Sequence, residues 1–174
     1  ALYSDTSGIF NTAIGNAALF NNLNGKQNTA VGSLALYYNK GSQNTALGYE
    51  ALAYNELSSN NVAIGDSALF NHSGSQGFNT AIGSKIMASN TQGYSNTAGG
   101  YAALYSNTTG HSNTALGQGA LYHLVGGDHN ISIGYGSGID PGSPNTINTI
   151  SIGNVGYINA ASNQAFIGNL RTRG

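Results

Sequence analysis

The 174-residue chain contains no cysteine and no tryptophan, and it has only two prolines and few charged side chains. The lack of cysteine excludes disulfide bonds and thiolate metal sites. Only 6% of the residues are charged, against roughly 25% in an ordinary globular domain. Because no basic cluster is available to contact phosphates, we expect no nucleic-acid partner. The longest apolar runs are only a few residues, so we also expect no membrane insertion.

The main feature of the sequence is a repeated motif. A motif of the type Asn-Thr-Ala-Ile-Gly recurs every 15 to 19 residues, and its closing glycines are Gly15, Gly32, Gly48, Gly65, Gly83, Gly100, Gly117, Gly134, Gly153 and Gly168. A period of this length is typical of solenoids, in which each copy forms one turn and contacts mainly its two neighbours. We therefore predict an all-β parallel solenoid, or β-roll, with about 17 residues per turn.

Each repeat is expected to contain two short strands. In the copy that ends at Gly65, Val62 and Ile64 share one face of the first strand and Ala63 lies on the other. We expect the aliphatic face to point inward, and the glycine to allow a bend that a Cβ would obstruct. In the repeats that end at Gly15 to Gly117, a leucine four residues after the glycine, or Met87 in one copy, marks the second strand. Two facing buried columns are predicted: Ile14, Val31, Leu47, Ile64, Ile82, Leu116 and Ile133, opposite Leu19, Leu36, Leu52, Leu69, Leu104 and Leu121.

The core of such a coil is thin, so we expect the outer faces to bury additional surface against other chains. On this interpretation the alanines lie outside, and an aromatic residue often follows the leucine, as in Phe20, Tyr37, Phe70, Tyr105 and Tyr122. A row of aromatic side chains is a large apolar surface for a monomer, so we predict self-association as a homotrimer. The same aromatic residues could instead bind a cell-surface glycan by stacking on sugar rings. Asparagines at equivalent positions are expected to stack in ladders.

The segment from Asn61 to Ser67, Asn-Val-Ala-Ile-Gly-Asp-Ser, resembles the head repeats of YadA-type trimeric autotransporter adhesins. The longer form of the repeat, Asn-Thr-Ala-Ile-Gly followed by Ala-Leu-Tyr/Phe, also resembles repeats of bacteriophage tail-fibre proteins. The resemblance implies a left-handed parallel β-roll assembled as a homotrimer. It implies a structural or adhesive rod of a phage fibre or bacterial surface adhesin, located extracellularly on a virion or cell surface, that supports or contributes to binding of host-surface glycans.

Two parts of the chain differ in regularity. Residues 1–134 hold the regular repeats, and they start in mid-repeat, because Ala1-Leu2-Tyr3-Ser4 matches Ala103-Leu104-Tyr105-Ser106. Residues 135–174 are irregular repeats that we interpret as a transition toward another domain.

No catalytic constellation is recognisable, so we expect no enzyme activity and assign no catalytic, cofactor-binding or metal-binding residue. The six acidic residues occupy no repeated position. His123, Asp128 and His129 could approach one another as metal ligands, but solvated loop residues are the favoured interpretation. An alternative function is ice binding by a flat array of threonines. The candidates are Thr12, Thr29, Thr45, Thr80, Thr97 and Thr114.

Overall fold

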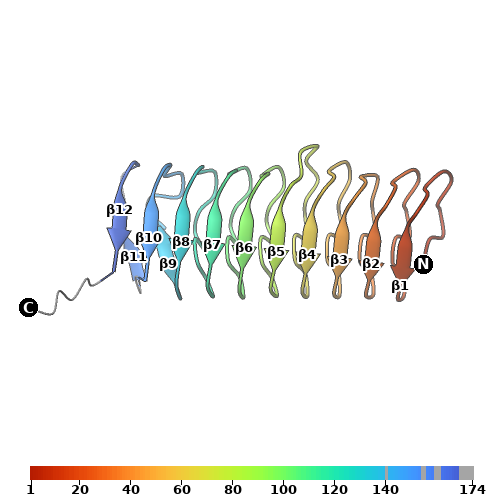
Figure 1. Cartoon of the computed structure of the whole chain (residues 1–174), viewed down its shortest axis with the longest axis horizontal. Helices are drawn as coiled ribbons and strands as arrows, with labels where there is room; N and C mark the ends of the chain where they lie inside the picture. Colours follow the sequence, from red (N-terminus) through yellow and green to blue (C-terminus); the bar gives the residue numbers. More distant parts are fainter. Residues whose placement is uncertain (140, 154–155, 159–161, 169–174) are drawn as a thin grey trace, which may run out of the picture.

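The computed structural model describes residues 1–139, 141–153, 156–158 and 162–168 of a β-solenoid (Figure 1). Ten three-residue strands form one parallel sheet along its length, in the order β1-β2-β3-β4-β5-β6-β7-β8-β10-β12. These strands are β1 Thr12–Ile14, β2 Thr29–Val31, β3 Thr45–Leu47, β4 Val62–Ile64, β5 Thr80–Ile82, β6 Thr97–Gly99, β7 Thr114–Leu116, β8 Ile131–Ile133, β10 Ile150–Ile152 and β12 Ala165–Ile167. No helix sufficient to cross a bilayer occurs among the described residues.

The register of the sheet places like residues over like. Thr12 pairs with Thr29, Ala13 with Ala30 and Ile14 with Val31, and later strands pair at the same positions of the repeat, although some pairs there join unlike residues, such as Thr114 with Ile131. The predicted parallel solenoid with one turn per repeat is therefore confirmed. The sheet continues past residue 134, since β10 pairs with β8 on one side and with β12 on the other.

The prediction of a second strand in every turn was wrong. In the regular repeats the leucine segment is a series of turns with alternate residues at positive φ, such as Ser67 at 53° and Leu69 at 51°. It still hydrogen-bonds from turn to turn, because the Leu69 amide donates to the Ile86 carbonyl at 3.0 Å. Among the residues that the structure describes, extended strands on this side occur only at β9 (Ser137–Ile139) and β11 (Gly156–Ile158), which pair in parallel with each other.

The direction in which the strands face was also predicted wrongly. The strand alanines point inward, and Ala30, Ala46, Ala63, Ala81 and Ala115 are fully buried. The aliphatic residues beside them point outward: Ile14 is 60% exposed and Ile82 is 49% exposed. The leucine column is buried as predicted. The interior is so narrow that leucine from one wall leaves room only for alanine from the other.

The repeat glycines allow the bend after each strand, as predicted, and most of them also let adjacent turns approach closely. Gly15 has a φ of 124°, and a Cβ added to it would lie 2.6 Å from the carbonyl oxygen of Gly32. Such a distance is too short for a real contact, so a side chain here would push the turns apart. A positive φ and a close backbone neighbour thus both require glycine at this bend.

The predicted asparagine ladders are confirmed in atomic detail. In the column that precedes each strand, the side-chain oxygen of one asparagine accepts the backbone N–H of its equivalent in the next turn. The Asn61 N–H, for example, donates to Asn44 Oδ1 at 3.0 Å. The side-chain amide of Asn28 donates to the Gly41 carbonyl at 3.0 Å. Because these groups are fully buried, each hydrogen bond avoids an unsatisfied polar atom in the core.

Candidate functional surfaces

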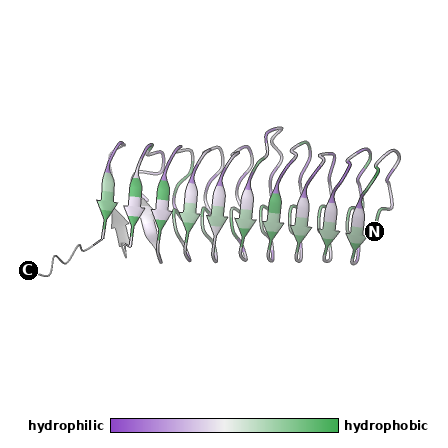
Figure 2. Ribbon diagram, viewed as in Figure 1, coloured by the Kyte–Doolittle hydropathy of each residue, from purple (hydrophilic) through white to green (hydrophobic). Residues whose placement is uncertain are grey.

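The first candidate surface is the outer face of the ten-stranded sheet, which we call the strand wall. It consists of the first and third residues of each strand: a column mainly of threonine beside a column of aliphatic residues. Figure 2 shows the hydrophobic ends of the strands in one row, with β4 hydrophobic along its whole length. These twenty positions include no charged residue. The strand wall is therefore a flat, uncharged stripe along the rod.

The strand wall is accessible in the single chain. Thr12, Thr29 and Thr97 are exposed, whereas Thr45, Thr80 and Thr114 are half-buried. In the neighbouring column Leu47 is 46% exposed. Ten strands about 4.8 Å apart, each of three residues rising about 3.3 Å, cover roughly 400–500 Å². Threonine occupies much of this stripe, so its contiguous apolar part is the aliphatic column, and exposed apolar surface that is contiguous often marks a contact surface.

The aromatic residues proposed from the sequence form two separate stacks. Near the N-terminus, Tyr3, Phe20 and Tyr37 stack in succession, with ring centroids 4.8 and 5.3 Å apart. Farther along, Tyr105 and Tyr122 stack at 5.1 Å. Phe70 belongs to neither stack. The five predicted residues are thus not one continuous row.

Phe70 instead meets Tyr54 edge-on at 5.1 Å, and Tyr54 belongs to a second aromatic column that the sequence prediction missed. This column lies one residue later in the repeat, where Tyr38 and Tyr54 stack with ring centroids 5.5 Å apart. Only two successive turns carry an aromatic residue there, so no periodic signal was available in the sequence.

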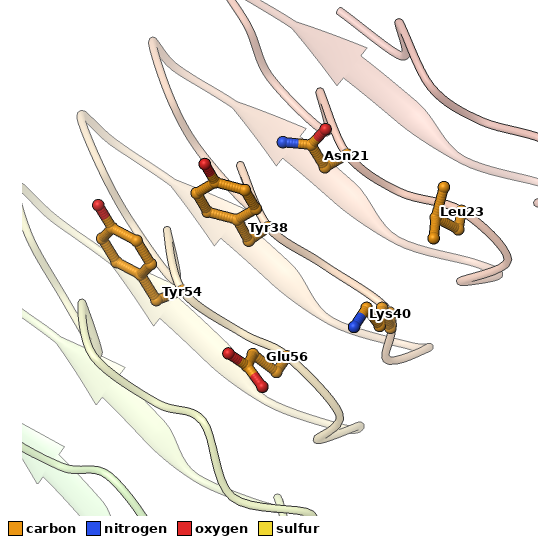
Figure 3. Close-up of a pocket in the computed structure, with 6 residues that line it drawn as sticks. All are labelled: Asn21, Leu23, Tyr38, Lys40, Tyr54 and Glu56. Carbon is orange, nitrogen blue, oxygen red and sulfur yellow. The ribbon is translucent and has the colours of Figure 1, made fainter.

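Tyr38 and Tyr54 line the second candidate surface, a groove of about 500 Å³ on the outside of the rod (Figure 3). One wall of the groove is formed by Asn21 and the two tyrosines, at equivalent positions of three successive turns. The opposite wall is formed by residues two positions later in the same turns, namely Leu23, Lys40 and Glu56. The groove thus combines aromatic rings with an amide, an ammonium group and a carboxylate.

The histidines considered as metal ligands are arranged differently from the sequence hypothesis. Asp128 pairs with His111, not with His123, at 3.4 Å between Nε2 and Oδ2. His129 lies edge-on to the His111 ring, and Tyr94 stacks on that ring. Among the described residues, no three histidine or acidic side chains lie close enough together to hold a metal ion.

A fourth histidine, His72, replaces asparagine in the ladder that follows the leucine segment, between Asn55 and Asn90. Those asparagines donate to carbonyls three residues later, whereas His72 Nε2 lies 3.0 Å from the Gln76 carbonyl, four residues later. The repeat from Gly65 to Gly83 is one residue longer than its neighbours, so the larger side chain spans the longer loop. Its complete burial lowers the pKa of His72.

No family model, no curated protein and no solved structure gives a significant match to this chain.

Proposed function

We propose that this chain is a structural and adhesive rod segment of a phage fibre or a bacterial surface adhesin. The observation that carries the proposal is the strand wall, an uncharged stripe of threonine and aliphatic side chains exposed along a ten-stranded sheet. A regular solenoid of this kind serves to hold a binding surface at a distance from a particle or cell. The resemblance of the repeats to adhesin heads and tail fibres supports the same role.

Self-association through the strand wall is the second part of the proposal. The alanine rows that first suggested a trimer are buried inside the chain, so they cannot contribute to it. The exposed aliphatic column takes their place. Since each turn is nearly identical to the next, parallel chains in register would place Ile64 and Ile82 against the same turns of their neighbours. Three such walls around one axis would bury the stripe completely, in agreement with the trimer implied by the resemblance.

Sedimentation velocity and native mass spectrometry test this proposal. We expect a species of three times the 17.7 kDa chain mass. Ile82→Asp would place a charge in the strand wall and should dissociate the assembly, because an unpaired charge is costly to bury. Glu50→Gln, a change outside the strand wall, is the matched control and should leave the trimer intact. A stable wild-type monomer at micromolar concentration would refute the assembly.

Ice binding is a second candidate, and the exposure of the threonine column favours it. With the strand orientation predicted from the sequence, the threonines would lie inside the coil beside the aliphatic residues, whereas in the single chain Thr12, Thr29 and Thr97 are exposed on the sheet. The two functions compete for one surface, since a strand wall buried in a trimer cannot contact ice.

Thermal hysteresis and ice-recrystallisation assays distinguish the two candidates. Hysteresis shown by a monomeric chain and lost in Thr29→Lys would establish ice binding and exclude the trimer. A trimer without hysteresis would establish the rod.

A further inference from the structure

We propose that the groove of Figure 3 is a binding site for a neutral oligosaccharide that lies along the rod. The inference deepens the proposed adhesive function and rests on it, because it names the surface and the class of ligand. It concerns none of the aromatic residues that the sequence analysis assigned to glycan contacts. The residues that carry it are Tyr38, Asn21, Lys40 and Glu56.

The decisive feature is one ring face of Tyr38. Tyr54 stacks on the other face with ring centroids 5.5 Å apart and an angle of 24° between the ring planes, and Tyr37 makes a T-shaped contact with Tyr38 at 4.6 Å. One turn toward the N-terminus, the equivalent position holds Asn21 instead of a third tyrosine. Because asparagine is shorter than tyrosine, it does not cover the Tyr38 ring as a third tyrosine would, and Tyr38 lines the groove and is 44% exposed. The stack of Tyr54 and Tyr38 therefore ends at Tyr38, beside Asn21 in the groove.

The polar groups around this ring face match the chemistry of a sugar. A pyranose has one apolar C–H face, which packs against an aromatic ring, and a rim of hydroxyl groups that both donate and accept hydrogen bonds. The groove offers the ring of Tyr38, donors on Lys40 and on the Asn21 amide, and acceptors on Glu56 and on the same amide. Its volume of about 500 Å³ falls within the usual range of small-ligand sites.

The charges in the groove favour a neutral ligand over an acidic one. The groove contains one ammonium group and one carboxylate, at equivalent positions of adjacent turns. Among the described residues the recorded salt bridge is that of His111 with Asp128, so Lys40 and Glu56 are not paired with each other. Both charges are therefore available to hydroxyl groups, and together they give the groove no net charge. A uronic or sialic acid would gain from Lys40 but would meet repulsion from Glu56.

The direction of the ligand follows from the arrangement of the walls. Equivalent residues of three successive turns line each wall, so the groove runs parallel to the axis of the rod. A chain of two or three sugar units would lie with one unit on the open face of Tyr38. The neighbouring unit would lie against the hydroxyl edge of Tyr54.

Isothermal titration calorimetry on the assembled protein tests the site. The neutral probes are chitohexaose, cellohexaose and maltohexaose, and a hyaluronan hexasaccharide and sialyllactose are the acidic probes. We expect at least one neutral probe to bind. Tyr38→Ala should weaken binding at least tenfold, and Asn21→Tyr should abolish it by covering the open ring face. Asn21→Tyr adds a ring to an existing stack, so it separates blocked binding from failure to fold. Tyr101→Ala is the matched control, because Tyr101 is 50% exposed and lies outside the groove, and it should bind as the wild type does.

Sedimentation of the same samples separates the two proposals. A trimer that binds none of the neutral probes, or that binds only the acidic ones, would overturn the groove inference and leave the rod intact. Binding that survives Asn21→Tyr, or that is lost equally in Tyr101→Ala, would also overturn it. A monomer that binds a neutral probe at Tyr38 would retain the site and overturn the trimeric assembly.

Discussion

The two walls of the solenoid differ in where their large aliphatic side chains lie. The wall formed by the leucine segments buries Leu19, Leu52 and Leu69 completely, whereas the strand wall exposes 60% of Ile14 and 49% of Ile82. Both walls contribute alanine to the interior. The difference shows that one wall fills the core of the single chain, while the other presents an apolar surface to the outside. Three variants test this division and a fourth tests a buried histidine, in order from the largest expected effect on folding to the smallest.

Leu69→Ala should have the largest effect. Leu69 is fully buried, so its truncation leaves a cavity between the walls and should lower the free energy of unfolding by about 2–5 kcal/mol. Urea denaturation monitored by circular dichroism measures the change, at a concentration where the assembly state is known. A loss below about 1 kcal/mol would show that the leucine column does not form the core.

Ala63→Leu tests the opposite wall from the inside. Ala63 is fully buried opposite the leucine column, and the added methyl groups would separate the walls at a cost of about 1–3 kcal/mol. Thermal unfolding of this variant should be compared with that of Ser75→Leu, in the loop before β5. If the strand alanines faced outward, as the sequence predicted, Ala63→Leu would not destabilise the chain. A stability equal to that of the wild type would therefore show that Ala63 points away from the core.

His72 makes folding sensitive to acid. Burial lowers the pKa of His72, so the folded chain holds it neutral while the unfolded chain takes up a proton below the ordinary histidine pKa of about 6.5. Stability contributed by the neutral form is complete above that pH and falls as the pH decreases toward the lowered pKa. His72→Gln removes the titrating group. Urea midpoints measured from pH 7.5 to pH 5 should therefore decrease less in the variant, and equal slopes would contradict a role for His72.

Ile82→Thr should have the smallest effect on the isolated chain. Its side chain is 49% exposed and lies in the threonine-rich strand wall, so the change should cost less than about 1 kcal/mol at dilutions where the chain is monomeric. The loss of about 2–5 kcal/mol that a buried isoleucine would give is not expected there. Under assembled conditions the same substitution should cost more, and the difference measures how far the partner chains bury this residue.

Several features of the fold could be predicted because a repeat imposes them. The period fixed one turn per copy, and stacking of identical copies aligned threonine with threonine and asparagine with asparagine. Gly15 and its equivalents could be assigned to the bend, since only glycine tolerates both a φ of 124° and the close carbonyl of the next turn. The leucine column was correctly placed in the core by its fixed offset from these glycines.

Other features could not be predicted. Alternation in a three-residue strand shows that Val62 and Ile64 share a face, but it does not reveal which face is inside. Leucine is uncommon at a φ near 50°. The sequence therefore offered no reason to predict turns instead of a strand at Leu69. The groove was missed because Tyr38 and Tyr54 occupy their column in two turns only, and because Lys40 and Glu56 meet them only after folding.

The sequence alone determined the period, the register and the positions that require glycine or asparagine. Each of these follows because equivalent positions of successive repeats stack on one another. Only the tertiary structure decided what faces inward and what gathers on the surface. The distance between the two walls sets that choice: it admits leucine from one side and alanine from the other, and so it leaves the isoleucines outside. The same stacking brings residues 17 positions apart into contact, which places an open tyrosine face beside Asn21.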